Sequence, residues 1–483
     1  MSMPLSNAAR RALDHSLLEL TATDAVSAMR KGGIKAEDYA RALLDRANEL
    51  QGLNAFISLN PGAVLDAARA ADKSRCAGER LGLLHGLPVP IKDSVNTKEL
   101  PTTNGTRALC EFRPKKNASV LEPLLAEGAI VMGKTNLHEL SWGWTSNNAT
   151  FGAVHNPYDQ TRIPGGSSGG SAATIAARIA PLAVGEDTYG SIRVPASCCG
   201  IAGLRPTFGR YPNDGIMPIT KGKFDQVGLL ARSVCDLALF DSVVSGEPVS
   251  ITAKTLEGLR LGLCPDFFQA DLDSEVERVT NEAFEKLREA GVTLVEAKAP
   301  EIFKAAPDVA LTIILYETVP AFAQFLDEQQ TGLSFEQMFA QMGEGLRAAM
   351  KSLAVPPNRP NANDYETKLA KREQLKRAVR RHFGEADITA LAFPTVMCRP
   401  PRIGEEVEAD IDTRKVPLST ALVRNVALGN CAGMASLVMP AGLTSDGLPV
   451  GLEFDALPGQ DRNLLALGLS LEDALSYIHR PKL

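Results

Sequence analysis

Glycine and serine are concentrated in residues 165–171, which read Gly-Gly-Ser-Ser-Gly-Gly-Ser. The four glycines free the backbone, and the Ala-rich run that follows is a good helix former. A Gly/Ser loop that enters a helix presents backbone N–H groups to an anion. The loop therefore points either to phosphate binding or to nucleophilic chemistry at one of its serines, Ser167 or Ser168.

The phosphate-binding interpretation lacks two features that it needs. No Gly-Lys-Ser or Gly-Lys-Thr ending follows the loop, and residues 159–164 before it are polar and end in proline. A nucleophile elbow fits the pattern Gly-x-Ser-x-Gly, but it also needs an acid and a histidine further along the chain. Only His382 and His479 lie downstream, and we expect both to be ordinary surface residues.

A second hydroxyl motif follows at residues 185–196, Gly-Glu-Asp-Thr-Tyr-Gly-Ser-Ile-Arg-Val-Pro-Ala. Here Ser191 comes directly after a Thr-Tyr-Gly turn and before a run of small residues. The successive N–H groups of Thr188, Tyr189, Gly190 and Ser191 could converge into a pocket for an oxyanion. The alternative is a plain turn between a strand at 182–184 and the next helix, and this motif alone does not decide between the two.

Alternating helical and extended patterns surround these motifs. Helical periodicity and capping signals predict helices at 25–30, 36–50, 121–126 and 276–290. Short apolar runs predict strands at 129–132, 292–295, 388–393 and 435–439. Residues 87–92, interrupted by prolines, predict an edge strand or one that leads into a loop. The alternation predicts an α/β protein with helices on both faces of its sheet.

Residues 300–360 differ from this pattern, because they are helical, contain Phe and Met, and close with Pro-Pro-Asn-Arg-Pro. Two interpretations are equally open: a separate helical cap over the sheet, or more of the same core. The charged helix predicted at 368–382 is expected to present a solvated face. The length of 483 residues suggests about three domains by itself, although no linker or internal repeat marks a boundary.

Charge and composition argue against several classes of protein. The chain carries 51 Lys and Arg against 57 Asp and Glu, a formal net charge of −6, which argues against nucleic-acid binding. Six histidines and eight scattered cysteines without a Cys-x-x-Cys pair argue against a metal site and predict reduced thiols. The first twenty residues lack the apolar core of a secretory signal, and the apolar run 310–316 is too short for a membrane span. We expect a cytoplasmic protein without a membrane or nucleic-acid partner.

Three segments, taken in order, resemble the amidase signature family: Pro-Val-Pro-Ile-Lys-Asp with Lys92, the loop with Ser167, and Asp-Thr-Tyr-Gly-Ser-Ile-Arg with Ser191. Their separations of 75 (167 − 92) and 24 (191 − 167) residues match the layout of that family. Stretches at 133–140, 200–210 and 439–452 extend the resemblance over roughly residues 20–475. The resemblance implies one large α/β amidase domain over 1–483, with a mixed central sheet flanked by helices on both faces. In this layout N-terminal helices occupy 20–80, the catalytic core occupies 85–240, and a helical cap over the substrate pocket would be 300–360.

The resemblance implies a Ser–Ser–Lys triad that cleaves the C–N bonds of small amides through an acyl-enzyme. Ser191 would attack the carbonyl carbon, and Ser167 would pass its proton towards Lys92. An exposed lysine has a pKa of about 10.4 and is protonated at neutral pH, so Lys92 must be buried to act as a base. No metal or organic cofactor is required. Asp187 and Arg193, which flank the nucleophile, are expected to be structural ions.

One departure from the family concerns the substrate, because Tyr189 stands where the family usually has the first glycine of Gly-Gly-Ser. We expect its side chain to shape substrate choice or to donate a phenol hydrogen bond. Trp142 and Trp144 would either wall an aromatic pocket or lie in the core. Residues 209–220 resemble the branch that hydrolyses aryl and arylalkyl amides, such as the indoleacetamide and mandelamide hydrolases. Carbamates and esters stay open as substrates, since the family includes urethanases.

The resemblance also leaves an alternative function open, the catalytic subunit of the glutamine-dependent tRNA amidotransferase. That subunit carries the same triad but works as part of a complex. The aryl-amidase-like stretch at 209–220 argues against it. The expected partner is therefore a small-molecule amide or carbamate, and the expected oligomeric state is a monomer or a homodimer.

Overall fold

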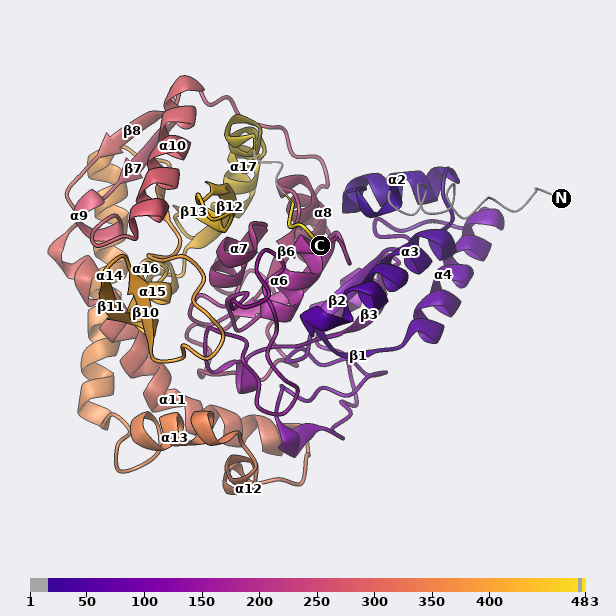
Figure 1. The fold of residues 1–483 in the computed structure, drawn as a ribbon, viewed down its shortest axis with the longest axis horizontal. Coiled ribbons are helices and arrows are strands. Elements are labelled where there is room, and N and C mark those ends of the chain that lie inside the picture. Colours follow the sequence, from indigo (N-terminus) through magenta and orange to yellow (C-terminus); the bar gives the residue numbers. More distant parts are fainter. Residues whose placement is uncertain (1–15, 477–479) are drawn as a thin grey trace.

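A computed structural model describes residues 16–476 and 480–483 of the chain (Figure 1). The expectations for residues 1–15 and for His479 lie outside the described residues. In the part described, the strands of the main sheet are β1 (Phe56–Leu59), β2 (Pro88–Lys92), β3 (Ile130–Thr135), β4 (Leu182–Asp187), β5 (Ala202–Arg205), β6 (Gln226–Ala231), β7 (Arg260–Leu263), β8 (Thr293–Glu296), β9 (Ala390–Pro394), β12 (Ala435–Leu443) and β13 (Pro449–Ala456). A separate hairpin contains β10 (Glu408–Ile411) and β11 (Arg414–Pro417).

Helices connect and cover these strands. The first half of the chain contains α2 (Ala22–Lys31), α3 (Ala36–Glu49), α4 (Pro61–Cys76), α5 (Leu121–Ala126), α6 (Gly169–Ala176), α7 (Arg193–Cys199) and α8 (Val234–Ser245). The second half contains α9 (Pro265–Phe268), α10 (Ser274–Glu289), α11 (Ala306–Glu328), α12 (Phe335–Ala340), α13 (Glu344–Leu353), α14 (Ala362–Ala386), α15 (Leu418–Val423), α16 (Ala427–Ala432) and α17 (Asp461–Leu475). Short 3-10 turns occur at Gln51–Leu53, Arg107–Leu109, Glu139–Ser141 and Glu301–Ala305.

The main sheet is mixed and continuous. Across the described residues its order is β1-β3-β2-β4-β6-β5-β12-β13-β9-β7-β8. β2 runs parallel to β3 and β4, and β7 runs parallel to β8 and β9, whereas the remaining pairs are antiparallel. Helices α6 and α7 pack on each other and contact β4, β12 and β13, whereas α8 and α17 pack on each other and contact β6 and β12. The expected α/β domain with a mixed sheet between helices is confirmed, and the estimate of three domains from length alone is wrong.

Strand β2 lies inside the sheet, between β3 and β4. Of the two positions expected from its prolines, the edge is therefore wrong, and the strand leads instead into the turn at residues 93–94. The register against β3 shifts between Val89 and Pro90, at a point where proline has no N–H to donate to the ladder. A local shift thus accommodates the prolines without moving the strand to an edge. All five residues of β2 are buried, which puts Lys92 at its C-terminal end inside the protein.

The N-terminal region contains the expected helices α2, α3 and α4, but it also contributes β1 at one edge of the sheet. β1 pairs antiparallel with β3, and Leu59 lies opposite Gly133. A Cβ at Gly133 would lie 2.6 Å from the carbonyl oxygen of Ser58, so glycine is needed here for close approach of the two strands. Gly133 therefore lies within β3 and does not end the strand, contrary to the sequence expectation.

Residues 300–360 form α11, α12 and α13, which lie along the lower edge of the molecule in Figure 1. α11 belongs to the core, since Ile313 and Phe322 are fully buried. In α13, by contrast, Met350 is the one residue that is buried, so this helix contributes little to the core. By length and composition the stretch Glu301–Glu328 is apolar enough to cross a membrane, unlike the shorter run considered above. Because 61% of its most apolar window is buried inside the protein, it has the burial of a core helix.

The close packing of α6 against neighbouring loops gives a test of the fold. A Cβ at Gly170 would lie 2.4 Å from the carbonyl oxygen of Asn136 and 2.5 Å from that of Ala55. Gly170→Ala must displace one of these backbones, and we expect it to lower the free energy of unfolding in urea by about 1–3 kcal/mol. Gly384, inside α14, has open space at the Cβ position, so Gly384→Ala is the matched control. The control should stabilise the protein by about 0.5–1 kcal/mol, and equal effects of the two changes would contradict this packing.

Candidate active site

Two parallel strands bring the sequence-predicted residues to one edge of the sheet. β2 ends at Lys92, and β4, its parallel neighbour, ends four residues before Ser191. Ser167 lies just before α6, which contacts both strands. The N–H of Ser168 donates to the carbonyl oxygen of Ser191 at 3.2 Å, so the two serine loops are joined through their backbones. The structure thus gathers Lys92, Ser167 and Ser191, which are far apart in the sequence.

Lys92 and Ser167 are in direct contact. The Nζ atom of Lys92 donates to the Oγ atom of Ser167 at 2.6 Å, and both side chains are fully buried. Ser191 is 4% exposed and lines a cavity. Among the described residues the structure gives no hydrogen bond between the hydroxyls of Ser167 and Ser191. The arrangement has a buried amine, a hydroxyl bonded to it, and a second hydroxyl that faces the cavity.

The pKa of Lys92 is lowered, because burial penalises its charged form. Glu186 opposes this shift: its Oε1 atom lies 3.1 Å from Nζ of Lys92, and both groups are buried. The hydroxyl of Ser141 donates to the same carboxylate oxygen at 2.5 Å. Sequence reasoning missed Glu186, although a second carboxylate beside Asp187 at the end of a strand was a visible signal.

Asp187 and Arg193 hold the turn that carries Ser191. The Nε atom of Arg193 lies 3.0 Å from Oδ2 of Asp187, and its Nη1 atom donates to Glu453 at 2.9 Å. Burial raises the pKa of Asp187, but the guanidinium groups of Arg193 and Arg205 outweigh it and hold that pKa well below its usual range. These ions are fully buried and bonded to one another, which is the structural placement expected for Asp187 and Arg193.

The four N–H groups predicted for an oxyanion pocket are not equivalent. The N–H of Gly190 donates to Oδ1 of Asp187 at 2.8 Å, so it is already committed to a carboxylate. The prediction for Gly190 therefore fails in this structure, because the same carboxylate that binds Arg193 also closes the turn. For the N–H groups of Thr188, Tyr189 and Ser191 the described residues offer no hydrogen-bond acceptor.

The cavity in front of Ser191 has a volume of about 700 Å³. Tyr189, Trp142 and Trp144 all line it. The rings of Tyr189 and Trp144 meet edge to face with centroids 5.9 Å apart, and Nε1 of Trp144 donates to the carbonyl oxygen of Tyr189 at 2.8 Å. The Tyr189 hydroxyl donates to the carbonyl oxygen of Pro307 at 3.4 Å. The phenol thus bonds to α11, while the ring forms part of the cavity wall.

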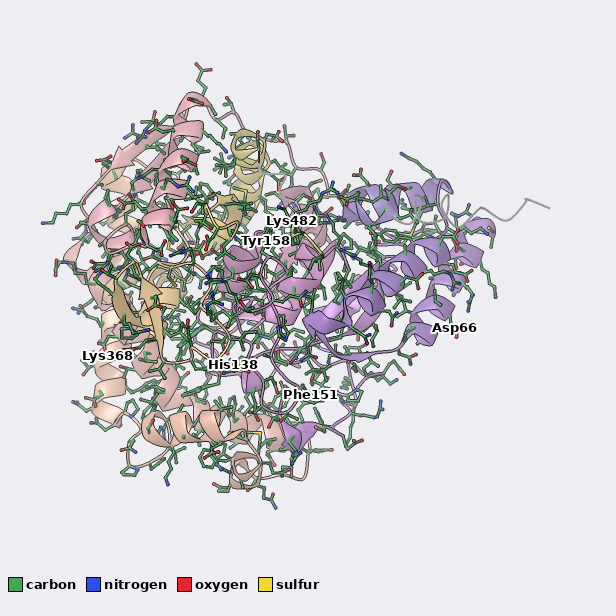
Figure 2. All side chains as sticks on the ribbon, in the orientation of Figure 1. Asp66, His138, Phe151, Tyr158, Lys368 and Lys482 are labelled. Carbon is green, nitrogen blue, oxygen red and sulfur yellow. The ribbon has the colours of Figure 1, made fainter. Side chains whose placement is uncertain are left out.

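A polar group in the cavity wall was not foreseen. The Nδ1 atom of His138 lies 3.1 Å from the hydroxyl of Thr145, which donates to Glu406 at 2.7 Å. Burial lowers the pKa of His138, which favours the neutral ring. In Figure 2, His138 lies in the lower middle of the molecule, between the sheet and α11. Thr145 and Glu406 are separated by 261 residues, and no local sequence pattern links them.

The histidine expected at the surface is also buried. His382 is 6% exposed, and its Nε2 atom lies 3.4 Å from the thiol of Cys264, so the expectation of a surface residue is wrong. It lies in α14, whose charged sequence hid this buried position. In the part of the chain that the structure describes, no group of three or more His, Cys, Asp or Glu residues could hold a metal ion.

Comparison with known proteins finds structural neighbours and sequence relatives along nearly the whole chain. Among solved structures, the peptide amidase from Stenotrophomonas maltophilia aligns with a TM-score of 0.82 and 27% identity, over 96% of this chain and 98% of that one. The indoleacetamide hydrolase of Agrobacterium vitis is 36% identical over 93% of this chain and 96% of the relative. The mandelamide hydrolase of Pseudomonas putida is 35% identical over 95% and 92%, respectively.

The family model described as Amidase matches residues 38–465, and the chain belongs to this family. The resemblance inferred from three short segments is thereby confirmed. A further relative is one of the subunits of the glutamyl-tRNA(Gln) amidotransferase of Chloroflexus aurantiacus, 35% identical over 88% of this chain and 91% of the relative.

The buried pair of Lys92 and Glu186 gives a pH-dependent test. If neutral Lys92 is the base, kcat/KM rises with pH as Lys92 loses its proton. The carboxylate of Glu186 opposes that loss, so Glu186→Gln lowers the pKa of Lys92 further. The acidic limb of a kcat/KM profile, measured on an anilide, should then move to lower pH by roughly one to three units.

Ser141→Ala is the matched control, since it keeps the charge of Glu186 and removes only a hydroxyl bonded to it. Its acidic limb should stay near the wild-type position. An acidic limb that stays in place or moves to higher pH in Glu186→Gln would mean that Lys92 is not the titrating base.

Proposed function

We propose that the chain hydrolyses aryl and arylalkyl amides with Ser191 as nucleophile, Ser167 as proton relay and Lys92 as base. The observation that carries this proposal is the buried 2.6 Å contact between Lys92 and Ser167, in a loop whose backbone is bonded to that of Ser191, which lines the cavity. A buried lysine with a lowered pKa is able to hold an unprotonated amine near neutral pH.

The first half of the reaction forms an acyl-enzyme. The Oγ atom of Ser191 attacks the carbonyl carbon, and its proton passes to Ser167, which gives its own proton to Lys92. The negative charge that develops on the carbonyl oxygen is stabilised by the N–H groups of Thr188, Tyr189 and Ser191. The C–N bond then breaks, and Lys92 returns the proton through Ser167 to the leaving amine.

The second half releases the acid. A water molecule attacks the acyl carbon, and its proton follows the same path to Lys92. The bond to Ser191 breaks, and the proton returns to Oγ of Ser191. Both halves are balanced, since the net change is the addition of one water across the amide bond. The residues of the chain supply every proton transfer.

The aromatic side of the cavity supports an aryl-bearing substrate. Trp142, Trp144 and Tyr189 offer ring surface beside Ser191, and aromatic groups gain from edge-to-face contact with such rings. The similarity to enzymes named indoleacetamide hydrolase and mandelamide hydrolase points in the same direction.

Carbamates are proposed as a second class of substrate for the same site. The carbonyl of a carbamate offers the same angle of attack to Ser191, and its complete hydrolysis yields carbon dioxide, an amine and an alcohol. Tyr189, in place of the usual glycine, favours an uncommon substrate because it adds a buried ring next to the nucleophile.

The alternative is an amidotransferase subunit that works only in a complex, a function supported by the relative from Chloroflexus aurantiacus. Hydrolysis of an anilide by the purified chain alone would decide for the independent amidase. We also propose a cytoplasmic monomer or homodimer without a nucleic-acid or membrane partner, in keeping with the net charge of −6.

A hydrolysis panel of aliphatic amides, anilides, aryl esters and carbamates tests the proposed nucleophile. Ser191→Ala should lower kcat/KM on every hydrolysed substrate on the order of 10⁴-fold or more. Ser168→Ala is the matched control, because this neighbouring hydroxyl donates to the backbone carbonyl of Glu186 at 3.1 Å. The control should lose far less activity. Full activity in Ser191→Ala would refute the mechanism.

The proposed role of Lys92 predicts a difference between amides and esters. An amine is a poor leaving group without a proton, whereas a nitrophenolate leaves readily. Lys92→Ala should therefore lower kcat/KM on an anilide by a factor about 10-fold larger than on the nitrophenyl ester of the same acid. Equal losses on the two substrates would remove Lys92 from the protonation of the leaving group.

Tyr189 is proposed to select substrates through its ring. Tyr189→Gly should change the ratio of kcat/KM values between aromatic and aliphatic amides by about 10-fold or more, since it removes a whole ring from the wall. Tyr189→Phe, which loses only the hydroxyl bonded to Pro307, should keep the ratio near that of the wild type. An unchanged ratio in Tyr189→Gly would exclude this role.

A further inference from the structure

The mouth of the cavity carries an unusual share of the exposed apolar side chains. Within the described residues, the strongly exposed large apolar side chains are Val249, Leu311, Leu353, Val407 and Leu483. Three of them, Leu311 (37% exposed), Leu353 (43%) and Val407 (80%), line the same cavity as Ser191. We call these three residues the rim. Exposed apolar side chains that cluster in one patch often mark a binding site, whereas single exposed apolar residues are common on any protein surface.

Helix α13 lines the cavity with an apolar stripe. Its apolar residues Leu346, Ala349, Met350 and Leu353 are spaced as i, i+3, i+4 and i+7, so they form one stripe along the helix. Such a stripe normally packs on the protein core, yet here Met350 is the buried member and the other three line the cavity. The apolar face of α13 is therefore shared between the core, on which Met350 and part of Leu346 pack, and the cavity that Ser191 also lines.

Helix α11 repeats this arrangement on the neighbouring wall. Leu311, Ile314 and Leu315 are spaced as i, i+3 and i+4, and all three line the cavity. Ile314 and Leu315 are buried, at 6% and 7%, whereas Leu311 reaches the mouth. The apolar wall thus continues from the interior of the cavity to the rim without a polar interruption on this helix.

The third rim residue is held in place by its neighbours. Glu406 accepts hydrogen bonds from the hydroxyl of Thr145 at 2.7 Å and from Nδ2 of Asn147 at 2.8 Å. The carbonyl oxygen of Val407 accepts from the N–H of Leu418 at 2.9 Å. Bonds on both sides of the peptide thus fix an 80% exposed valine at the cavity mouth.

We propose that the rim is an outer subsite that binds an apolar segment of the substrate, remote from the bond that is cleaved. The inference rests on the proposed function and specifies its substrate class: elongated amides or carbamates with an apolar tail. A cavity of about 700 Å³ lies within the range that holds drug-sized ligands, well beyond a single aryl amide. The tail would cover the stripe of α13 and reach solvent past the exposed side chains of Leu353 and Val407.

A substrate series of graded length tests the proposal. One series is made of nitroanilides of linear acids from two to ten carbons, and a second joins phenylacetic acid to linear amines of the same lengths. In at least one series, wild-type kcat/KM should rise about two- to fourfold for each methylene that the rim covers. The series that rises also shows which side of the scissile bond faces the rim. No rise in either series would overturn the proposal.

The rim is then removed by the triple change Leu311→Ser, Leu353→Ser and Val407→Ser. The dependence of kcat/KM on chain length should become flat, so the loss relative to wild type grows with each methylene. Val249→Ser is the matched control, because Val249 is 42% exposed and does not line the cavity. It should keep the wild-type slope. A triple variant that also keeps that slope would overturn the proposal.

Two further measurements separate the remaining outcomes. Light scattering reports whether the rim change alters the mass of the particle, since conversion of a dimer into monomers would make the rim a subunit interface instead. Ser191→Ala, run on the shortest substrates, tests the proposed function separately. If Ser191 is required but chain length has no effect, only the outer subsite fails; if Ser191 is not required, the proposed function itself fails.

Discussion

The burial of one amine, that of Lys92, is the constraint on which the rest of the site depends. A lysine in water keeps its proton at neutral pH, and only removal from solvent lowers its pKa enough for a base. That removal requires β2 to lie inside the sheet, with β3 and β4 on either side and α6 above it. Glu186 and Ser167 then give the buried nitrogen its polar partners.

The same strand arrangement determines where Ser191, the proposed nucleophile, lies. Because β2 and β4 are parallel, their ends face the same edge of the sheet, and the turn after β4 places Ser191 at the same edge as Lys92. The turn is kept rigid by Asp187, which binds Arg193 and the N–H of Gly190 together. A buried ion pair of this kind is weak evidence of stability, but it orients the backbone around it. Here the oriented group is the serine-bearing turn.

Local sequence patterns indicated the candidate reacting residues, but they did not predict the tertiary contacts around those residues. Lys92, Ser167 and Ser191 could be proposed as the reacting groups because each stands in a short motif of glycines, prolines and small residues with a recognisable spacing. The interior position of β2 could not be predicted from the sequence, because prolines usually mark an edge strand. The register shift that accommodates them depends on the pairing with β3. Contacts such as Thr145 with Glu406 join segments 261 residues apart, and only the folded chain brings them together. The burial of His382 could not be predicted, because which residues of the charged helix α14 are buried follows from packing and not from composition.

The order of the elements along the chain has an evolutionary consequence. The residues proposed for chemistry lie between β2 and α7, whereas α11, α12 and α13 are consecutive and arrive much later. α11 and α13 wall the cavity from one side without contributing to the strands that hold Lys92. Mutations at the cavity-lining positions of α11 and α13 can therefore accumulate in this single stretch while the buried side of α11 and the reacting groups stay untouched. One scaffold is in this way open to diversification of its substrates by changes in a separate, contiguous piece of the gene.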